Sequence, residues 1–341
     1  MHDRPRLKSH AQLLRRGPGS LQLGLCPDAG VVLDGLSEAE IALTECLDGS
    51  RDLQGLYALA AEAGVAADRL SALIAALSDH HLLVDTATDR AWLTPLDGVR
   101  HQPLSPDTTA MAIAAAYHLA GDGPDLVGAR STQHVLISGE GDLPCALAHL
   151  LRVGGIGRVS VGTNAVNALD LGLRSHRTGR RASLGSPPDR QARPDLVVLA
   201  ALGAIRAEAG APWLRRGIPH LPVVVQAHRV QVGPLITSAQ GPCLSCMDLH
   251  RRDRDPAWPA VLSQLSPTWP LRPGAPVNLE STLTATTIGV AAMIVHTCLD
   301  GQPVPRDLSL ELSLACPAIL SRRWFRHPLC GCTGNHETMT G

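Results

Sequence analysis

Residues 134–161 read HVLISGEGDLPCALAHLLRVGGIGRVSV. The apolar run His134–Ser138 predicts a buried strand, and the apolar residues of Pro144–Val153 predict a helix after a glycine-containing turn. Arg158–Val161 then predicts a second strand. Two further apolar runs continue the alternation, Asp195–Ala200 and Leu221–Gln226. Alternating apolar strands and helices are typical of a doubly wound, Rossmann-type α/β sheet, and we expect that fold class here.

The residues before this stretch predict a separate small unit. Ser37 and Glu40 have the spacing of a capping box at the start of a helix. Three short strands followed by three helices, as in a winged-helix domain, are expected at Gln12–Arg16, Leu21–Leu25, Gly30–Asp34, Glu38–Leu47, Leu53–Glu62 and Asp68–Ser78. We therefore expect a winged-helix domain at 1–95, a linker with one helix at 96–128, and the α/β domain at 129–341.

The charge and composition of the chain exclude several classes of function. Thirty basic residues balance 31 acidic ones, for a net charge of −1, and aromatic residues make up 2%. Such a composition predicts neither a basic surface nor stacking platforms for nucleic acid. The polar start is not a signal peptide, and the longest apolar runs, Leu196–Ile205 and Thr287–Val295, are shorter than the roughly 20 residues that span a bilayer. We therefore expect a cytoplasmic protein that binds neither nucleic acid nor a membrane.

Two close pairs of cysteines stand far apart in the sequence. Cys243 and Cys246 form a C-x-x-C motif, and Cys330 and Cys332 form a C-x-C motif shortly after His327. Four thiolates in two pairs suit a tetrahedral, structural Zn²⁺ site, and we expect zinc there. Two alternatives are a redox-active C-x-x-C motif and thiols without a ligand. Because the C-x-C spacing is tight, His327 is an alternative ligand in place of one cysteine.

A run of alternating charges, from Met247 to Trp258, follows the first cysteine pair. The simpler interpretation is a solvated segment with i,i+4 ion pairs such as Asp248–Arg252. The alternative is a surface that docks a partner, with Trp258 as its anchor. A helix expected at Thr284–Cys298 is apolar on most faces, which predicts that it is buried. The position of the charged run beside the cysteines also allows a dimer contact.

The turn that follows the first strand of the α/β domain has the position of a nucleotide-binding loop but lacks its chemistry. Gly139 and Gly141 match the first two glycines of a G-x-G-x-x-G motif, and Pro144 takes the third position. Glu140 and Asp142 place negative charge where phosphates would lie, which is repulsive. We therefore expect a degenerate nucleotide loop that does not bind ATP.

Together these features resemble a known family. Four of them are similar to the ThiF-like fold, the adenylating domain of ubiquitin-activating enzymes: the Gly139–Gly141 turn, the Asp195–Ala200 strand, Gly241–Cys246 and Cys330–Cys332. The cysteine motifs and the charged run resemble more closely the ThiF-like leader-peptide-binding proteins of azole-forming (thiazole/oxazole-modified microcin) peptide pathways. The resemblance covers about residues 105–335. It implies that the unit in front is a PqqD-like peptide-recognition element with a winged-helix fold. It also implies a homodimer formed through the α/β domain, to which we expect the helix at Thr284–Cys298 and the segment after Cys246 to contribute.

The departures from adenylating members of that family concern the groups that handle ATP. Those members have an acidic residue after the second strand, where this chain has Gly162 and Asn164. They have a magnesium-binding Asp at the end of a later strand, where this chain has Ala200–Gly203. They also place a lysine near the phosphates, whereas Lys8, the one lysine here, lies outside the domain. Without these groups the charge that develops during adenylyl transfer is not stabilised, so we expect a non-catalytic member.

The resulting hypothesis is a protein that captures a precursor or leader peptide and presents it to a modifying enzyme, such as a YcaO-like one. The peptide would add a strand to an exposed sheet edge of the winged helix and lay its side chains against the third helix. The residues expected to bind it are Val31, Val32, Leu33, Arg69, Leu73, Ala76 and Leu77. The alternative for these residues is an ordinary core and surface. The alternative function is an ATP-dependent adenylyltransferase that activates a peptide carboxylate. A third possibility is a DNA-binding regulator, but the third helix has a single cation, Arg69, which is too few for a recognition helix.

Overall fold

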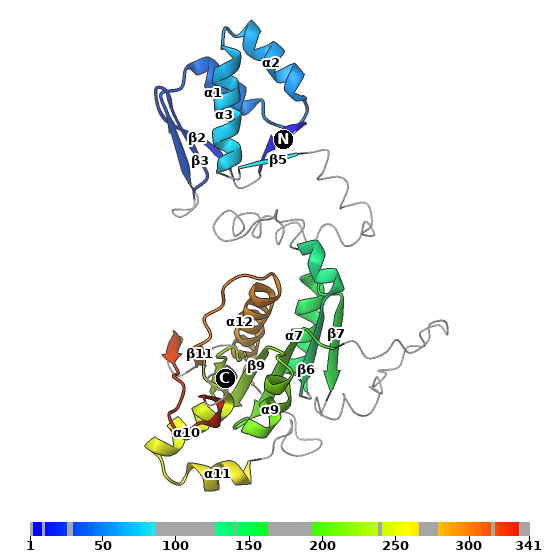
Figure 1. The fold of residues 1–341 in the computed structure, drawn as a ribbon, viewed down its shortest axis with the longest axis vertical. Coiled ribbons are helices and arrows are strands. Elements are labelled where there is room, and N and C mark those ends of the chain that lie inside the picture. The colour runs from blue at the N-terminus through cyan, green and yellow to red at the C-terminus, as the bar shows by residue number, and fades with distance from the viewer. Residues whose placement is uncertain are drawn as a thin grey trace, which may run out of the picture. The chain divides into compact units, whose positions relative to one another are not determined.

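The computed structural model describes residues 3–8, 11–25, 30–80, 82–85, 127–139, 141–162, 193–237, 241–265, 279–314 and 318–333. The chain divides into two compact units, Met1–Ala129 and Arg130–Gly341 (Figure 1). The helix predicted within the linker lies outside the described residues, as do Glu140 and Asn164.

The first unit contains the three strands and three helices that the sequence predicts. They are β2 (Leu13–Gly17), β3 (Ser20–Leu23), β4 (Val31–Asp34), α1 (Glu38–Glu45), α2 (Leu53–Glu62) and α3 (Ala67–Asp79). The strands form an antiparallel sheet in the order β2-β3-β4. The capping box is present, because the Ser37 hydroxyl accepts from the backbone of Glu40 and the Glu40 carboxylate accepts from the backbone of Ser37. Leu21 and Leu23 of β3 are fully buried against the helices.

A second, two-stranded sheet in this unit was not predicted. It pairs β1 (Pro5–Leu7) with β5 (Leu83–Asp85) in antiparallel fashion. The Asp85 carboxylate also accepts a hydrogen bond of 2.6 Å from the backbone of Asp3. The start of the chain is thereby attached to the segment that follows α3.

The second unit is built on one seven-stranded sheet with the order β12-β11-β10-β9-β8-β6-β7. Four strands are parallel: β6 (His134–Ser138), β7 (Arg158–Gly162), β8 (Leu196–Leu202) and β9 (His220–Gln226). Three are antiparallel: β10 (Arg229–Val232), β11 (Leu308–Ser313) and β12 (Ala318–Arg323). The predicted α/β class is confirmed, with a mixed sheet whose antiparallel half the sequence did not indicate.

Helices cover both faces of this sheet (Figure 1). The helices α7 (Asp142–Val153) and α12 (Ser281–Leu299) pack on the face that carries Ile137 and Val198. The helices α9 (Ala207–Arg215) and α10 (Leu244–Arg254) pack on the face that carries Leu136 and Val197. Three short elements complete the description: α11 (Trp258–Gln264) and the 3-10 turns η1 (Arg130–Thr132) and η2 (Gly331–Thr333).

Helix α12 is longer and more exposed than the sequence predicted. One face packs against α7 and strands β9 to β11, through residues such as Leu283, Ala291 and Val295. The opposite face is open among the described residues, and Met293 is 58% exposed there. Its length and apolar composition would allow it to cross a membrane, a property that core helices of soluble proteins share. The prediction of a buried helix therefore holds for one face only.

A buried ion pair holds the C-terminal end of α12. The Arg130 guanidinium donates two hydrogen bonds, of 2.8 and 2.6 Å, to the carboxylate of Asp300, and a third of 2.8 Å to the carbonyl of Gly154. Both charged side chains are almost fully shielded from solvent. The pair thus connects η1 with the ends of α12 and α7.

Candidate functional site

Four cysteines meet in the second unit. Cys243 precedes α10 as its N-cap residue, Cys246 lies in the first turn of that helix, and Cys330 and Cys332 lie at the turn η2. Their sulfur atoms all lie within 4.8 Å of one another. Cys243 and Cys330 are 87 positions apart in the sequence, so the cluster joins distant parts of the chain. The structure thus brings together all four residues that the sequence indicated as metal ligands.

The distances between these sulfur atoms fit a bound metal ion rather than disulfides. They are 3.8 Å for Cys243 to Cys246, 3.5 Å for Cys243 to Cys330, and 3.4 Å for Cys246 to Cys332. A disulfide requires about 2.05 Å. Four sulfurs that each lie about 2.3 Å from a Zn²⁺ ion at the centre of a tetrahedron are about 3.8 Å apart. The four-cysteine donor set and its spacing are therefore consistent with a structural zinc site.

The thiols of this cluster have strongly different proton affinities. The pKa of Cys246 is lowered to about 4, chiefly because Cys243 donates a hydrogen bond to its sulfur, with a further contribution from the backbone of His327. The pKa of Cys243 is raised, because it is the donor in that bond and because it is buried. Burial also raises the pKa of Cys332 to about 12. Neighbouring thiolates repel one another, so full deprotonation of the cluster requires a cation among the sulfurs.

His327 is a neighbour of the cluster and not a ligand. Its Nε2 lies 2.7 Å from a carboxylate oxygen of Asp253, and its Nδ1 accepts a hydrogen bond of 3.1 Å from the backbone of Leu329. The hydrogen bond from His327 lowers the pKa of Asp253. The carbonyl of His327 accepts from the backbone of Cys330 at 2.9 Å. The histidine therefore fixes the loop that presents Cys330 against the end of α10.

Most of the charged run after Cys246 lies in the helix α10, and its ion pairs differ from the predicted ones. Asp248 pairs with Arg251 at 3.1 Å, an i,i+3 contact, and not with Arg252. The Arg251 guanidinium lies over two indole rings, with its central carbon 5.3 Å from the centroids of both Trp258 and Trp324. Burial lowers the pKa of this arginine. Trp258 is thus half-buried within its own chain, where it supports α10.

The turn between β6 and α7 has the backbone of a glycine loop. Gly139 and Gly141 have φ angles of 143° and 111°, which side chains disfavour. A Cβ atom at Gly139 would lie 3.1 Å from the carbonyl oxygen of Ala200, at the end of β8. A cleft of about 280 Å³ opens beside the turn, between Asp142 of α7 and the start of α12 near Thr284. The exposed Asp142 side chain is in the first turn of α7, where a nucleotide loop would hold phosphate.

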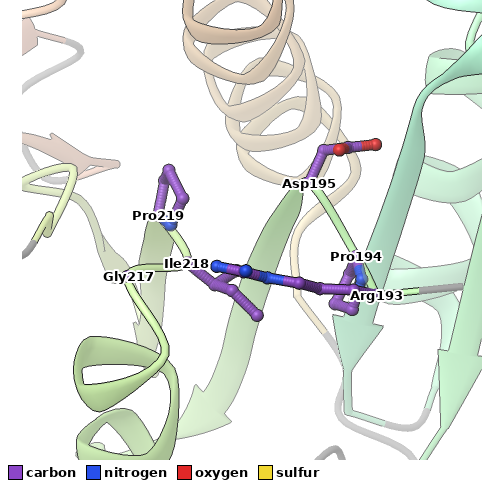
Figure 2. Close-up of a pocket in the computed structure, with 6 residues that line it drawn as sticks. All are labelled: Arg193, Pro194, Asp195, Gly217, Ile218 and Pro219. Atoms are coloured by element: carbon purple, nitrogen blue, oxygen red, sulfur yellow. The ribbon is translucent and has the colours of Figure 1, made fainter.

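A second cleft lies at the opposite, amino-terminal end of the parallel strands. It has a volume of about 260 Å³ and is lined by the segments Arg193–Asp195 and Gly217–Pro219. Figure 2 shows Arg193 extended toward Gly217, while the Asp195 side chain points away. The guanidinium of Arg193 donates to the carbonyl of Arg216. Asp195 accepts a 2.7 Å hydrogen bond from the backbone of His134, so both charged residues serve contacts within the fold.

Strand β4 is one of the two edges of the small sheet in the first unit, and among the described residues its outer side is unpaired. The backbone N–H of Gly24, just after β3, donates a hydrogen bond of 2.9 Å to the carbonyl of Gln12, just before β2. Along two antiparallel strands, opposite residues form hydrogen-bonded and non-hydrogen-bonded pairs in alternation. The even-numbered residues of β3 therefore bond to β2 and the odd-numbered ones to β4. By the register of β3 with β4, Leu33 bonds inward and the N–H of Val32 is directed outward. Val32 is also 39% exposed.

The other residues predicted to bind a peptide have different environments. Leu73 and Leu77 of α3 lie in the core of the first unit, at 7% and 0% exposure, which removes them from an open groove. Ala76 is half-buried beside them. Arg69 is exposed, and its Nε donates a hydrogen bond of 2.8 Å to the buried carboxylate of Glu40. The sequence did not indicate this partner. An acidic peptide residue would therefore compete with Glu40 for this guanidinium.

The comparisons with known proteins concern the fold. No family model matches the sequence, and no curated protein matches it. Among solved structures, a heterocyclase in complex with substrate and cofactor matches with a TM-score of 0.62 and 18% identity over 97% of this chain. The heterocyclase TruD matches with a TM-score of 0.61 and 16% identity, again over 97% of this chain. The chain spans about two-fifths of these heterocyclases, covering 40% and 42% of their length.

The match to E. coli MccB extends over nearly the full length of both proteins. The structure of MccB with succinimide has a TM-score of 0.62 and 14% identity, covering 97% of this chain and 99% of MccB. Structures of MccB with ATP and with MccA match as well, with TM-scores of 0.60 and 0.58. At these identities the likeness establishes the fold alone. The chain therefore has the ThiF-like α/β fold of E. coli MccB, preceded by a small N-terminal unit with its own sheet.

Proposed function

We propose that this chain is a non-catalytic, cytoplasmic protein that binds the leader segment of a precursor peptide. It captures that segment on its first unit and presents it to a separate modifying enzyme, such as a YcaO-like one, during maturation of a ribosomally made peptide. Zinc held by the four cysteines has a structural role in the second unit. The proposed partners are thus one peptide and one enzyme.

The observation that carries this proposal is the free edge of β4. An extended peptide can pair with the outward N–H of Val32, because edge strands offer unpaired backbone groups for strand addition. Val31 and Leu33 face the core side and are half-buried, so they leave apolar surface beside an added strand. Main-chain bonds would supply affinity and these side chains would supply specificity.

The second unit supports the non-catalytic part of the proposal. Strand β8 ends in Ala200–Leu202 without a carboxylate that could hold Mg²⁺, and Asp142 opposes phosphate at the start of α7. The likeness to heterocyclases over about two-fifths of their length favours a role beside such an enzyme. The modification chemistry is then the task of another polypeptide.

The test uses paired substitutions at the free edge of β4. Val32→Pro removes the outward N–H, whereas Val32→Thr changes the side chain and keeps this donor. The full chain and both variants are used to capture peptides from an extract of the native host, followed by mass spectrometry. We expect one short precursor peptide that the wild type and Val32→Thr retain and Val32→Pro loses. Equal capture by Val32→Pro, or no captured peptide at all, would refute peptide binding by strand addition.

An ATP-dependent adenylyltransferase is the second candidate function. It is favoured by the glycine turn at Gly139–Gly141, by the cleft of about 280 Å³ beside it, and by the common fold with a protein solved with ATP. The discriminating measurement is Mg²⁺-dependent exchange of pyrophosphate with ATP in the presence of the captured peptide. We expect no exchange, and a clear signal that is lost in Gly139→Val would establish the enzyme instead.

A further inference from the structure

The cleft between α7 and α12 lies at a place where α/β sheets bind ligands. Open sheets of this kind take ligands outside the carboxyl ends of their strands, where the strand order reverses. Here the order reverses between β6 and β8, and α7 begins just after β6. The cleft measures about 280 Å³, below the roughly 300–1,000 Å³ of sites that enclose drug-sized ligands. Its position indicates a binding site, and its size suits a small group.

The helix N-termini at this cleft are already complemented by carboxylates of the chain. Asp142 lies in the first turn of α7. Glu280 caps α12, and its carboxylate accepts a hydrogen bond of 2.9 Å from the backbone of Leu283. Hydrogen bonds from Thr282 and from the backbone of Leu283 lower the pKa of Glu280 to about 2, so this group is charged at neutral pH. The positive ends of both helix dipoles therefore offer little to an anionic ligand.

The polar side chains that line the cleft can only accept further hydrogen bonds. Ser281 donates its hydroxyl proton to the Glu280 carboxylate at 3.2 Å, and Thr284 donates its own to the Glu280 carbonyl at 3.0 Å. A hydroxyl has one proton, so both oxygens retain acceptor capacity alone. The exposed Asp142 carboxylate adds more acceptors, and no group in the described part of the chain donates to it. This lining is suited to a ligand that donates hydrogen bonds and carries positive charge.

Apolar side chains form the rest of the lining. Leu143 of α7 is buried, Leu279 and Ile288 are half-buried, and Ala285 is exposed. Long cationic side chains bury their methylene groups on such surfaces and keep the charged end among polar groups. The cleft thus combines a wall for an aliphatic chain with acceptors for the cation at its end.

We propose that this cleft binds a primary ammonium group carried on an aliphatic stem, as in lysine. Its three protons match the Asp142 carboxylate and the hydroxyl oxygens of Ser281 and Thr284. The stem packs against Leu143 and Ile288. A lysine side chain of a peptide and a free alkyl diamine share this chemistry. The site is separate from the peptide proposed at β4, and its charge preference is the reverse of that of a nucleotide loop.

The experiment measures binding to the full chain by isothermal titration at low ionic strength. Two amine probes distinguish the sources: cadaverine represents a free diamine, and Nα-acetyl-lysine amide represents a peptide side chain. Nα-acetyl-norleucine amide is the matched ligand without the ammonium group, and pyrophosphate is the anionic one. We expect an amine probe to bind with a millimolar dissociation constant and both control ligands to bind more weakly.

Two substitutions test the lining of the cleft. Asp142→Asn removes the charge at nearly constant size and should weaken amine binding about tenfold, as expected for one hydrogen bond to a charged group. Ala285→Leu fills the cleft, leaves every acceptor in place and should abolish binding. Asp255→Asn is the matched control, because it removes an exposed carboxylate at the end of α10, on the other face of the sheet. This control should bind the amines like the wild type.

Circular dichroism establishes that each variant is folded. Binding of either amine that Asp142→Asn or Ala285→Leu weakens, and that Asp255→Asn preserves, supports the proposal, and the tighter amine identifies the source. Three outcomes would overturn it: no amine binding at millimolar concentration, tighter binding of a control ligand, or amine binding that the cleft substitutions weaken no more than Asp255→Asn does. None of these outcomes involves β4, so they are distinct from a failure of peptide capture there.

Discussion

Replacement of Cys246 by serine tests the metal site, because this sulfur is fully buried and contacts two other members of the cluster. An ion held by the four cysteines would close a loop of 87 positions between Cys243 and Cys330. Closing a loop of that length lowers the conformational entropy of the unfolded chain, which corresponds to about 4 kcal/mol of free energy from (3/2)RT ln n. Loss of the ion should lower the free energy of unfolding of the second unit by this amount. For a unit of this size the melting temperature should then fall by about 8–16 °C.

The assay combines metal analysis by mass spectrometry with thermal unfolding followed by circular dichroism. The wild type should carry about one zinc ion per chain, because four cysteines at this spacing form one tetrahedral site. Cys145→Ser is the matched control, since Cys145 is exposed on α7 and lies outside the cluster. A folded wild type that carries no metal, or a Cys246→Ser variant with the metal content and melting temperature of the control, would refute the reasoning.

Three further predictions concern ionisable groups. Burial lowers the pKa of His220 from 6.5 to about 4. Between these two pH values the unfolded chain carries a proton on His220 that the folded chain lacks, so stability is lost as the pH falls from 6.5 to about 4. His220→Gln should therefore remove about 3 kcal/mol of the change in unfolding free energy that urea titration measures between pH 7 and pH 4, and an unaltered change would exclude this group. The pKa of Glu40 is lowered, chiefly by the hydrogen bond from Arg69, so its contribution is present above the unfolded pKa and is lost as the pH falls through the folded one. Glu40→Gln keeps the capping box and should lower the urea midpoint of the first unit at pH 7 more than at pH 3; an equal effect at both would contradict the ion pair. Asp300→Asn removes the carboxylate from a buried pair with Arg130 and should cost about 3–5 kcal/mol in thermal unfolding, with recovery when both residues are made apolar.

The elements that the sequence predicted are those whose signal is local. The strands β8 and β9 are buried on both faces, so uninterrupted apolar runs mark them. Strands β11 and β12 mix polar and apolar residues with partial exposure, and their sequences resemble those of loops. The three-residue strands β1 and β5 owe their existence to pairing between segments nearly 80 positions apart, for which no local pattern exists.

In the candidate site, too, the residues with a specific local pattern could be predicted and those that depend on long-range contacts could not. The four cysteines could be identified because their chemistry and pairwise spacing are specific to a metal site. The predicted peptide groove could not be placed with the same accuracy. Apolar residues at helical spacing indicate a buried face of the helix, but they do not indicate whether a peptide or the domain's own core covers that face. Leu73 and Leu77 are covered by the core of their own unit. The role of His327 depends on Asp253, a contact that only the folded chain creates.

The four-cysteine cluster also determines the order in which the two units can mature during synthesis. The named strands and helices of the first unit are all present once Asp85 has been made, because β5 is the last of them among the described residues. The cluster, in contrast, needs Cys332, which is among the last of the described residues. Since domains generally fold as they emerge, the first unit can fold while α10 still presents only two of the four cysteines. If the four cysteines hold zinc, the ion would be loaded late in assembly, and a shortage of zinc would leave the second unit open after the first has folded.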